Sequence, residues 1–168
     1  MTGEGFFLSG EEAKEPYLYK GCGLEGIYLL NGYTIFEHDG DRHIKISNVP
    51  GLHQAIGRFI VRNRKGLSPR EIRFLRNTMD LTQAQLAAKL GNTSQSVARW
   101  EKGECEIPGT AEKLLRAVYL ASLRREDDLQ MLRLLLEQTL EELDELDELS
   151  SQPAQFELFD RWEERPAA

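Results

Sequence analysis

The stretch from Leu81 to Gly103, LTQAQLAAKLGNTSQSVARWEKG, constrains the fold of this chain more than any other part. Thr82 is a natural N-cap for a first short helix, and Gly91 ends that helix in a tight turn. A second short helix follows and ends at Gly103, with polar side chains on its outer face. Two short helices in this order suit a pair whose second helix enters the major groove of DNA.

The formal net charge of −7 hides a strong segregation of charge along the chain. Residues 51–125 carry 14 basic and 6 acidic side chains, a net +8. Residues 126–168 carry 3 basic and 14 acidic side chains, a net −11, and residues 1–50 carry a net −4. A basic block between acidic segments indicates a polyanion-binding module with an acidic appendage.

Length and apolar runs limit the class of protein. At 168 residues the chain can hold one ordinary domain or two small ones. No apolar run approaches the roughly 20 residues that cross a bilayer, and the N-terminus lacks a basic region followed by an apolar one. We therefore expect a cytoplasmic protein that does not bind membranes. Cys22 and Cys105 lie far apart without CxxC spacing, which favours reduced thiols.

The pattern of the first 66 residues predicts two segments. Residues 1–16 are expected to form a mobile arm, and residues 17–66 a small α+β domain. Two β-prone runs, residues 33–37 and 42–47, flank the turn signal Asp39-Gly40 and predict a hairpin. A short amphipathic helix follows with Leu52, Ile56, Phe59 and Ile60 on one side. We expect apolar side chains from the β-prone segments to hold the sheet: Tyr17, Tyr19, Leu24, Tyr28, Leu30, Ile35, Phe36, Ile44 and Ile46.

The next module begins at a well-formed helix N-terminus. Ser68 is a natural N-cap, Pro69 fits the first helical position, and Glu71 completes a capping box. This signal places a helical domain at residues 67–123. Residues 124–150 predict a long acidic helix with leucines spaced by three or four, and residues 151–168 a short aromatic and acidic tail.

The helical domain resembles a known family. Over Leu67–Leu120, the segments Leu81-Thr82-Gln83, Leu86-Ala87, Leu90-Gly91, Val97 and Arg99–Gly103 followed by Pro108 resemble the Cro/CI-type (XRE) helix-turn-helix domain. The ending Arg-Trp-Glu-Lys-Gly most resembles antitoxins of the MqsA family, in which a zinc-ribbon domain precedes this helix-turn-helix. Together with the residue patterns above, the resemblance predicts a mainly α protein: a five-helix-type helix-turn-helix domain preceded by a small α+β domain and followed by a long acidic helix.

The resemblance also implies which side chains meet DNA. If Val97 and Trp100 point inward, Ser94, Gln95, Ala98, Arg99 and Lys102 point outward. By resemblance Gln95 and Arg99 read bases, since glutamine can pair with adenine and arginine with guanine. Phosphate contacts are expected from four further side chains: Gln83, Ser94, Ser96 and Lys102. Glu101 is expected to pair with an arginine of the first helix of the domain, and Trp100 to pack in the core.

The zinc site of the MqsA-type domain is not expected here. That site uses four cysteines in paired spacing, whereas this region offers Cys22 with His38, His43 and His53 as the possible substitutes. These four side chains are spaced like no common zinc finger. We therefore expect a metal-free version of the domain and no cofactor.

Three interpretations remain open for residues 125–162. The leucines can pack on the core or on a partner subunit, with the acidic side chains in solvent. Phe156, Phe159 and Trp162 can dock into a groove on another protein. The acidic segment can also compete with phosphates for the basic face.

Taken together, these features predict a homodimeric repressor of transcription that binds double-stranded DNA at a pseudo-palindromic operator. By resemblance it is an autoregulating antitoxin with a possible toxin partner. The alternative is a protein-interaction adaptor, or a toxin-neutralising partner, whose helix-turn-helix does not read DNA. No Ser-His-Asp, paired-carboxylate, Walker or HExxH pattern is present, so we do not expect an enzyme.

Overall fold

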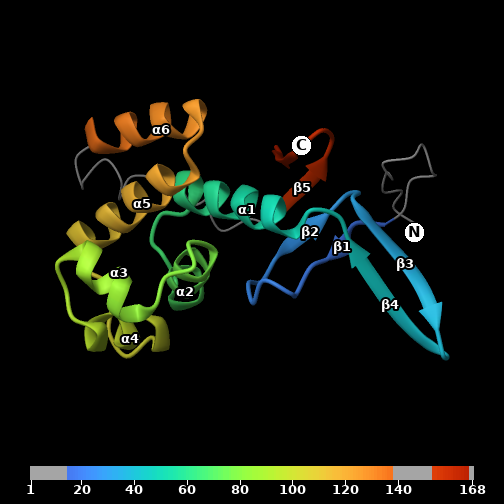
Figure 1. The fold of residues 1–168 in the computed structure, drawn as a ribbon, viewed down its shortest axis with the longest axis horizontal. Coiled ribbons are helices and arrows are strands. Elements are labelled where there is room, and N and C mark those ends of the chain that lie inside the picture. Colours follow the sequence, from blue (N-terminus) through green and yellow to red (C-terminus); the bar gives the residue numbers. More distant parts are fainter. Residues whose placement is uncertain (1–14, 138–152, 167–168) are drawn as a thin grey trace. The chain divides into compact units, whose positions relative to one another are not determined.

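The computed structural model describes residues 15–137 and 153–166. The described residues form two compact units, residues 15–56 with 153–166 and residues 57–137 (Figure 1). Helix α1 (Val49–Asn63) contributes to both units, so the division lies inside a helix instead of at the expected boundary after residue 66. Pro50 does not break this helix because it lies in the first turn, where a proline is tolerated.

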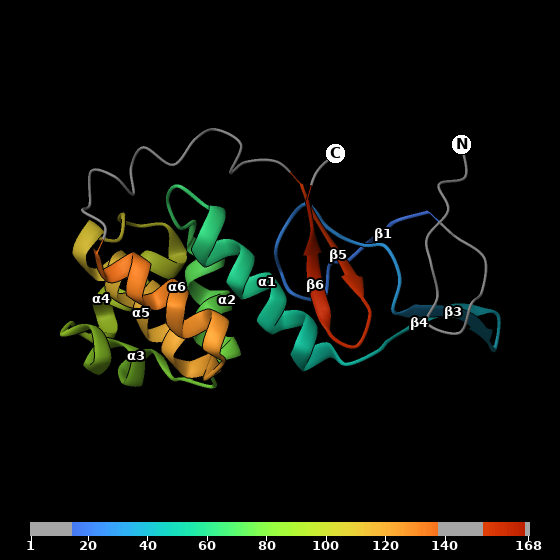
Figure 2. The ribbon, with the colours of Figure 1, turned by 90° about the horizontal axis from the view of Figure 1, so that it is seen from above.

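The first unit is built on a four-stranded sheet. It contains β1 (Tyr17–Leu18), β2 (Ile27–Leu29), β5 (Ala154–Leu158) and β6 (Trp162–Arg165) in the order β1-β2-β5-β6. Strands β2 and β5 are parallel, and the other two pairs are antiparallel. Strands from the two ends of the chain therefore lie side by side (Figure 2).

The C-terminal segment is part of this sheet, which corrects the interpretation of residues 151–168 as a separate tail. Burial alternates along β5, so that Ala154, Phe156 and Leu158 are buried. Phe156 and Trp162 are 0% and 2% exposed and cannot dock into another protein from this position. Of the three proposed docking aromatics, Phe159 alone is exposed.

Asn31 and Gly32 hold the C-terminal hairpin in place. The Asn31 Nδ2 donates to the Leu158 carbonyl at 2.9 Å, and its Oδ1 accepts from the Leu158 amide at 2.6 Å. The indole Nε1 of Trp162 donates to the Ser47 carbonyl at 2.9 Å. Gly32 has φ +74 and lies against the Trp162 ring, where a Cβ atom would clash. The Asn-Gly turn therefore binds a segment that is remote in sequence.

The predicted hairpin is confirmed, but it forms a sheet of its own. Strands β3 (Tyr33–His38) and β4 (Asp41–Ile46) pair with each other across Asp39 and Gly40, both at positive φ. The expectation that Phe36, Ile35, Ile44 and Ile46 hold the main sheet is wrong. Phe36 is exposed and the three isoleucines are half-buried. The sheet core comes from β2 and β5, together with Tyr19 and Leu24.

The second unit is helical. After the end of α1 it contains α2 (Pro69–Thr78), α3 (Gln83–Leu90), α4 (Ser94–Lys102), α5 (Gly109–Leu123) and α6 (Glu126–Glu137). The expected capping box at Ser68, Pro69 and Glu71 is present. The core of this unit contains Leu75, Leu86, Leu115 and Leu120, each 0% exposed.

Helix α6 lies in the first half of the segment predicted as a long acidic helix, residues 124–150. Asp128 in its first turn is buried and accepts a hydrogen bond from Arg58 of α1 at 2.7 Å. Leu135 is buried, whereas Leu129, Leu134 and Leu136 are exposed. Residues 138–150, the remainder of the segment predicted as an acidic helix, and residues 1–14, most of the predicted N-terminal arm, lie outside the described residues. No described helix combines the length and apolarity needed to cross a membrane.

Candidate DNA-binding site

Local capping signals set the geometry of α3 and α4. Thr82 caps α3 through a capping box with Gln85, and Gly91 ends it in the left-handed conformation at φ 64. Thr93 caps α4 and accepts from the Ser96 amide, which resolves the choice among three possible caps. Gly103 ends α4 at φ 74. The expected pair of short helices is confirmed.

Helix α4 has one buried and one exposed face. Val97 and Trp100 are 0% and 3% exposed, as predicted, and anchor the helix in the core. The predicted base readers Gln95 and Arg99 are exposed, and so is Ser94 at the helix start. The period of 3.6 residues therefore places glutamine and arginine side chains together on the solvent face.

A network around Glu101 ties α4 to α2 and α3. Arg76 of α2 donates to both carboxylate oxygens of Glu101, from Nε at 2.5 Å and from Nη2 at 3.0 Å. The Nη2 of Arg73 donates to the Glu101 carbonyl at 3.2 Å. The predicted pairing of Glu101 with an arginine of the first helix of the domain is confirmed. A bidentate pair of this kind fixes orientation as well as distance.

Gln83 belongs to the same network. Its Nε2 donates to Oε2 of Glu101 at 2.9 Å, and its side chain is half-buried. The amide predicted to meet a phosphate is thus bonded within the protein. Ser96 is half-buried, with its hydroxyl 3.0 Å from the Thr93 hydroxyl. The phosphate roles of Gln83, Ser94, Ser96 and Lys102 stay predictions.

Replacing Glu101 by glutamine is expected to destabilise the helical unit by about 1–3 kcal/mol, because Arg76 then loses its charged acceptor. Burial acts to raise the pKa of Glu101, but the hydrogen bonds from Arg76 and Gln83 and the charges of Arg76 and Arg73 bring it below the ordinary 4.5. Because the pKa of Glu101 is lower in the folded than in the unfolded protein, its ionised carboxylate stabilises the fold fully above pH 4.5. This stabilisation is lost as the pH falls through the folded-state pKa. Urea unfolding at several pH values measures the difference between wild type and variant.

The exposed Glu106 provides the matched control for this charge change. Glu106→Gln is expected to change the free energy of unfolding by less than about 0.5 kcal/mol. A Glu101→Gln effect as small as this, or one that does not shrink in acid, would contradict the structural role of the network.

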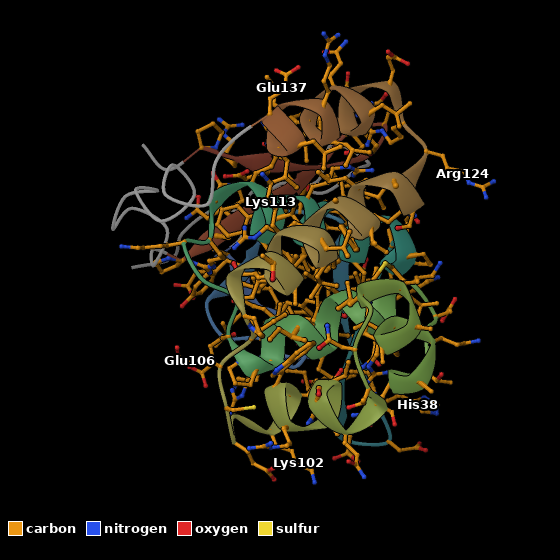
Figure 3. All side chains as sticks on the ribbon, turned by 90° about the vertical axis from the view of Figure 1, so that its left-hand side faces the viewer. His38, Lys102, Glu106, Lys113, Arg124 and Glu137 are labelled. Carbon is orange, nitrogen blue, oxygen red and sulfur yellow. The ribbon has the colours of Figure 1, made fainter. Side chains whose placement is uncertain are left out.

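A carboxylate that sequence reasoning missed lies at the end of α4. Oxygen Oε2 of Glu104 is 3.8 Å from Nε of Arg99, and Oε1 is 3.9 Å from Nζ of Lys102. All three side chains are at least half exposed. Lys102 extends away from the ribbon in Figure 3. The outward cations of α4 are therefore paired with an acidic neighbour in the free protein.

The basic block contributes less to this surface than its sequence charge indicates. Of its 14 basic side chains, four are internal: Arg58, Arg64, Arg76 and Arg116. Each is at most 15% exposed and paired with a carboxylate. These cations hold helices together and are not available to phosphates.

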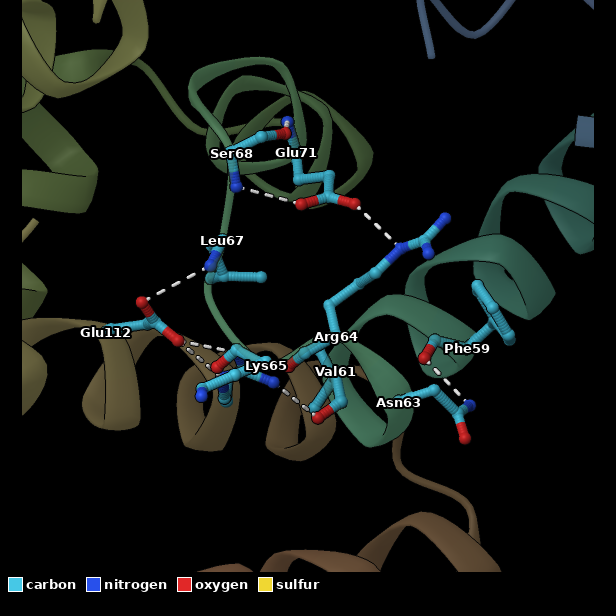
Figure 4. A network of polar contacts seen from close by, with 10 residues as sticks. Phe59, Val61, Asn63, Arg64, Lys65, Leu67, Ser68, Glu71 and Glu112 are labelled. Carbon is cyan, nitrogen blue, oxygen red and sulfur yellow. Dashed lines mark hydrogen bonds and ion pairs between the residues drawn. The ribbon is translucent and has the colours of Figure 1, made fainter. Parts of the chain in front are cut away.

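Arg116 joins α5 to the end of α1. Its guanidinium donates to the carbonyls of Val61 and Arg64, both at 2.8 Å, and to the Glu112 carboxylate. These three acceptor residues are labelled in Figure 4. Glu112 also accepts from the Leu67 amide at 3.3 Å. The side chain of Arg116 is only 2% exposed, and sequence reasoning gave it no role. This pair fixes the segment that leads into α2.

The side chains considered as possible zinc ligands, Cys22, His38, His43 and His53, do not come together at one site. His38 and His43 lie on the β3–β4 hairpin with ring centroids 6.3 Å apart. His53 accepts or donates a hydrogen bond at 2.8 Å with the Tyr19 hydroxyl, and Cys22 contacts the Tyr19 carbonyl. Among the described residues, no three His, Cys, Asp or Glu side chains are placed to hold a metal ion.

Comparison with known proteins identifies the helical part of the chain. Residues 72–117 match the model of a helix-turn-helix family. No curated protein and no solved structure matches the chain, and the resemblance to MqsA antitoxins gains no support. The match covers α3, the turn and α4, whose outward and inward faces are described above. Residues 72–117 form a Cro/CI-type (XRE) helix-turn-helix domain, typically non-enzymatic, which implies DNA binding and a role in the regulation of transcription.

Proposed function

We propose that this protein is a homodimeric repressor that recognises a pseudo-palindromic operator through α4. The observation that carries the proposal is the exposure of Gln95 and Arg99 on the face opposite the buried Val97 and Trp100. In such a domain the second helix of the pair lies in the major groove and presents outward side chains to base edges. Arg99 reads guanine, and Gln95 reads adenine.

The remaining polar groups of the pair position the domain on the backbone. Ser94 and Ser96 lie in the first turn of α4, where free amide groups and the helix dipole favour a phosphate. Lys102 supplies a cation at the other end. Gln83, at the start of α3, bonds to Glu101 through one hydrogen of its Nε2 and has a second that can donate to a phosphate.

A dimer would place two copies of α4 about 34 Å apart, one turn of DNA. Selection of bound fragments from a random DNA pool tests the proposal. We expect a two-fold symmetric consensus whose half-sites are separated by about one helical turn. A pool without enrichment, combined with no retention of DNA at low salt, would instead favour the adaptor that binds another polypeptide.

The antitoxin setting is the finer part of the proposal and rests on the resemblance of Arg99–Gly103. An autoregulating antitoxin binds its own promoter and a toxin. Co-expression with the product of a neighbouring small reading frame tests this setting. Relief of toxicity together with binding to the shared promoter is the expected result. Promoter binding alone would reduce the assignment to a stand-alone regulator, and relief of toxicity alone would reduce it to a toxin-neutralising partner that does not read DNA.

Arg99→Ala is expected to weaken operator binding by about 1–3 kcal/mol and to relax preference at one base pair, because a bidentate guanine contact is lost. Lys102→Ala is the matched comparison on the same helix. It should weaken binding to all sequences alike and lower the salt slope by about 1. Fluorescence anisotropy with the operator and its single-base variants measures both effects. Intact base preference in Arg99→Ala would show that α4 is not the reading helix as assigned.

A further inference from the structure

The turn after α4 brings Glu104 back against the last turn of α4, the helix that is proposed to read DNA. The amide of Glu104 donates to the Arg99 carbonyl at 3.0 Å, across the left-handed Gly103. This closure is the usual end of a helix with a C-terminal glycine, and it fixes the backbone from which the Glu104 side chain starts. The carboxylate is thereby held beside Arg99 and Lys102.

These two ion pairs contribute little to stability. All three side chains are at least half exposed, and exposed pairs are weakened by water, salt and side-chain entropy. Their position is more informative than their strength. A carboxylate within 4 Å of both cations lies inside the Debye length of about 8 Å, so a phosphate approaching either cation is repelled by it.

The contact with Arg99 has a direction. Glu104 lies nearest to Nε, the nitrogen at the stem of the guanidinium. A guanine contact needs two parallel hydrogen bonds to O6 and N7, which the terminal nitrogens of arginine can donate. At 3.8 Å this contact is an electrostatic attraction and not a hydrogen bond, so it biases the orientation of the guanidinium without occupying its terminal nitrogens. It therefore favours one geometry of base contact over the many that a phosphate accepts.

We propose that Glu104 is a positioning residue that raises the sequence specificity of α4. It orients Arg99 toward a base edge and reduces the attraction of Arg99 and Lys102 for phosphates at random sites. The inference rests on the proposed DNA-reading function. It explains why an acidic side chain lies next to the two outward cations of the helix.

The test compares Glu104→Gln with Glu106→Gln, using the full chain. Glu106 is also exposed and extends away from the ribbon (Figure 3). The two variants thus share the same change in net charge and lie two residues apart. Binding is measured by competition between the sequence selected by the wild type and random-sequence duplex, over a salt titration.

Glu104→Gln is expected to strengthen binding to random duplex about threefold to tenfold and to steepen the salt slope by up to about 1, comparable to one added phosphate contact. The ratio of operator to random affinity should fall by a similar factor, with weaker preference at the base pair that Arg99 reads. Glu106→Gln should leave this ratio within about twofold of wild type.

An Arg99→Ala background separates positioning from bulk charge. In that background Glu104→Gln should still strengthen random binding through Lys102 but should not change base preference further. If the wild type selects an operator but Glu104→Gln and Glu106→Gln show the same ratio of operator affinity to random-duplex affinity, this inference is overturned and the proposed function is not. A wild type that selects no sequence would overturn the proposed function and this inference with it.

Discussion

Trp162→Ala is expected to lower the free energy of unfolding of the sheet-containing unit by about 3–5 kcal/mol. Trp162 is 2% exposed, and its Nε1 donates to the Ser47 carbonyl at 2.9 Å. Gly32 lies directly against the ring, and its positive φ fixes the backbone there. Alanine would remove the ring, leave a cavity beside Leu158 and Gly32, and leave the Ser47 carbonyl without this donor.

Phe159→Ala is the matched control, since Phe159 is an aromatic of the same hairpin and is 57% exposed. It should change stability by less than about 0.5 kcal/mol. Hydrogen exchange resolved along the chain measures both variants, with the Leu30 amide, which donates to Phe156, as the reporter. Equal protection at Leu30 in the two variants would show that the C-terminal hairpin does not stabilise the sheet.

The helix-turn-helix could be predicted because its signals are local. Ser68 and Thr82 each accept from an amide three residues later, and Gly91 acts at the end of a single helix. Burial of Val97 and Trp100 follows from the helical period, which also places Gln95 and Arg99 outside. Signals of this range can be read from a sequence without knowledge of the rest of the fold.

The C-terminal strands could not be predicted in the same way. Phe156, Phe159 and Trp162 are three apart, a spacing that hides the alternation of β5. That strand pairs in parallel with β2, and Asn31 bonds to a residue 127 positions away. An isolated short strand has no partner in its own neighbourhood, so its pairing depends on contacts that only the folded chain supplies. The β3–β4 hairpin was predicted, but the exposure of Phe36 was not, because the apolar residues of these strands resemble core positions.

Only part of the candidate site could be predicted, because some of its residues meet through local helix periodicity and others through turns or distant contacts. The outward pair on α4 follows from periodicity, whereas Glu104 reaches Arg99 through a turn at Gly103. Arg116 was missed because arginine is usually exposed and nothing near it in sequence indicates burial. Its acceptors include backbone carbonyls more than 50 residues away, and carbonyl groups are present at every residue. A sequence pattern cannot single them out.

Arg116→Met is expected to destabilise the helical unit by about 3–5 kcal/mol, the usual cost of removing one partner of a buried ion pair. Methionine has a similar length but no donors, so the carbonyls of Val61 and Arg64 and the carboxylate of Glu112 lose their hydrogen bonds. Unfolding in guanidinium chloride, followed by helical circular dichroism, measures the loss because most described helices belong to this unit.

Arg62→Met makes the same substitution on an exposed residue in the last turn of α1 and should change stability by less than about 0.5 kcal/mol. Removing the unpaired charge in Arg116→Met/Glu112→Leu should recover part of the loss, since an uncompensated buried carboxylate is the larger penalty. The carbonyls would remain without donors, so recovery should be incomplete. If Arg116→Met and Arg62→Met unfold at the same denaturant concentration, the junction between α1 and α2 does not depend on this guanidinium. The orientation of α2, and through Arg76 and Glu101 that of α4, would then have to be held by apolar packing and by the ion pair between Arg64 and Glu71.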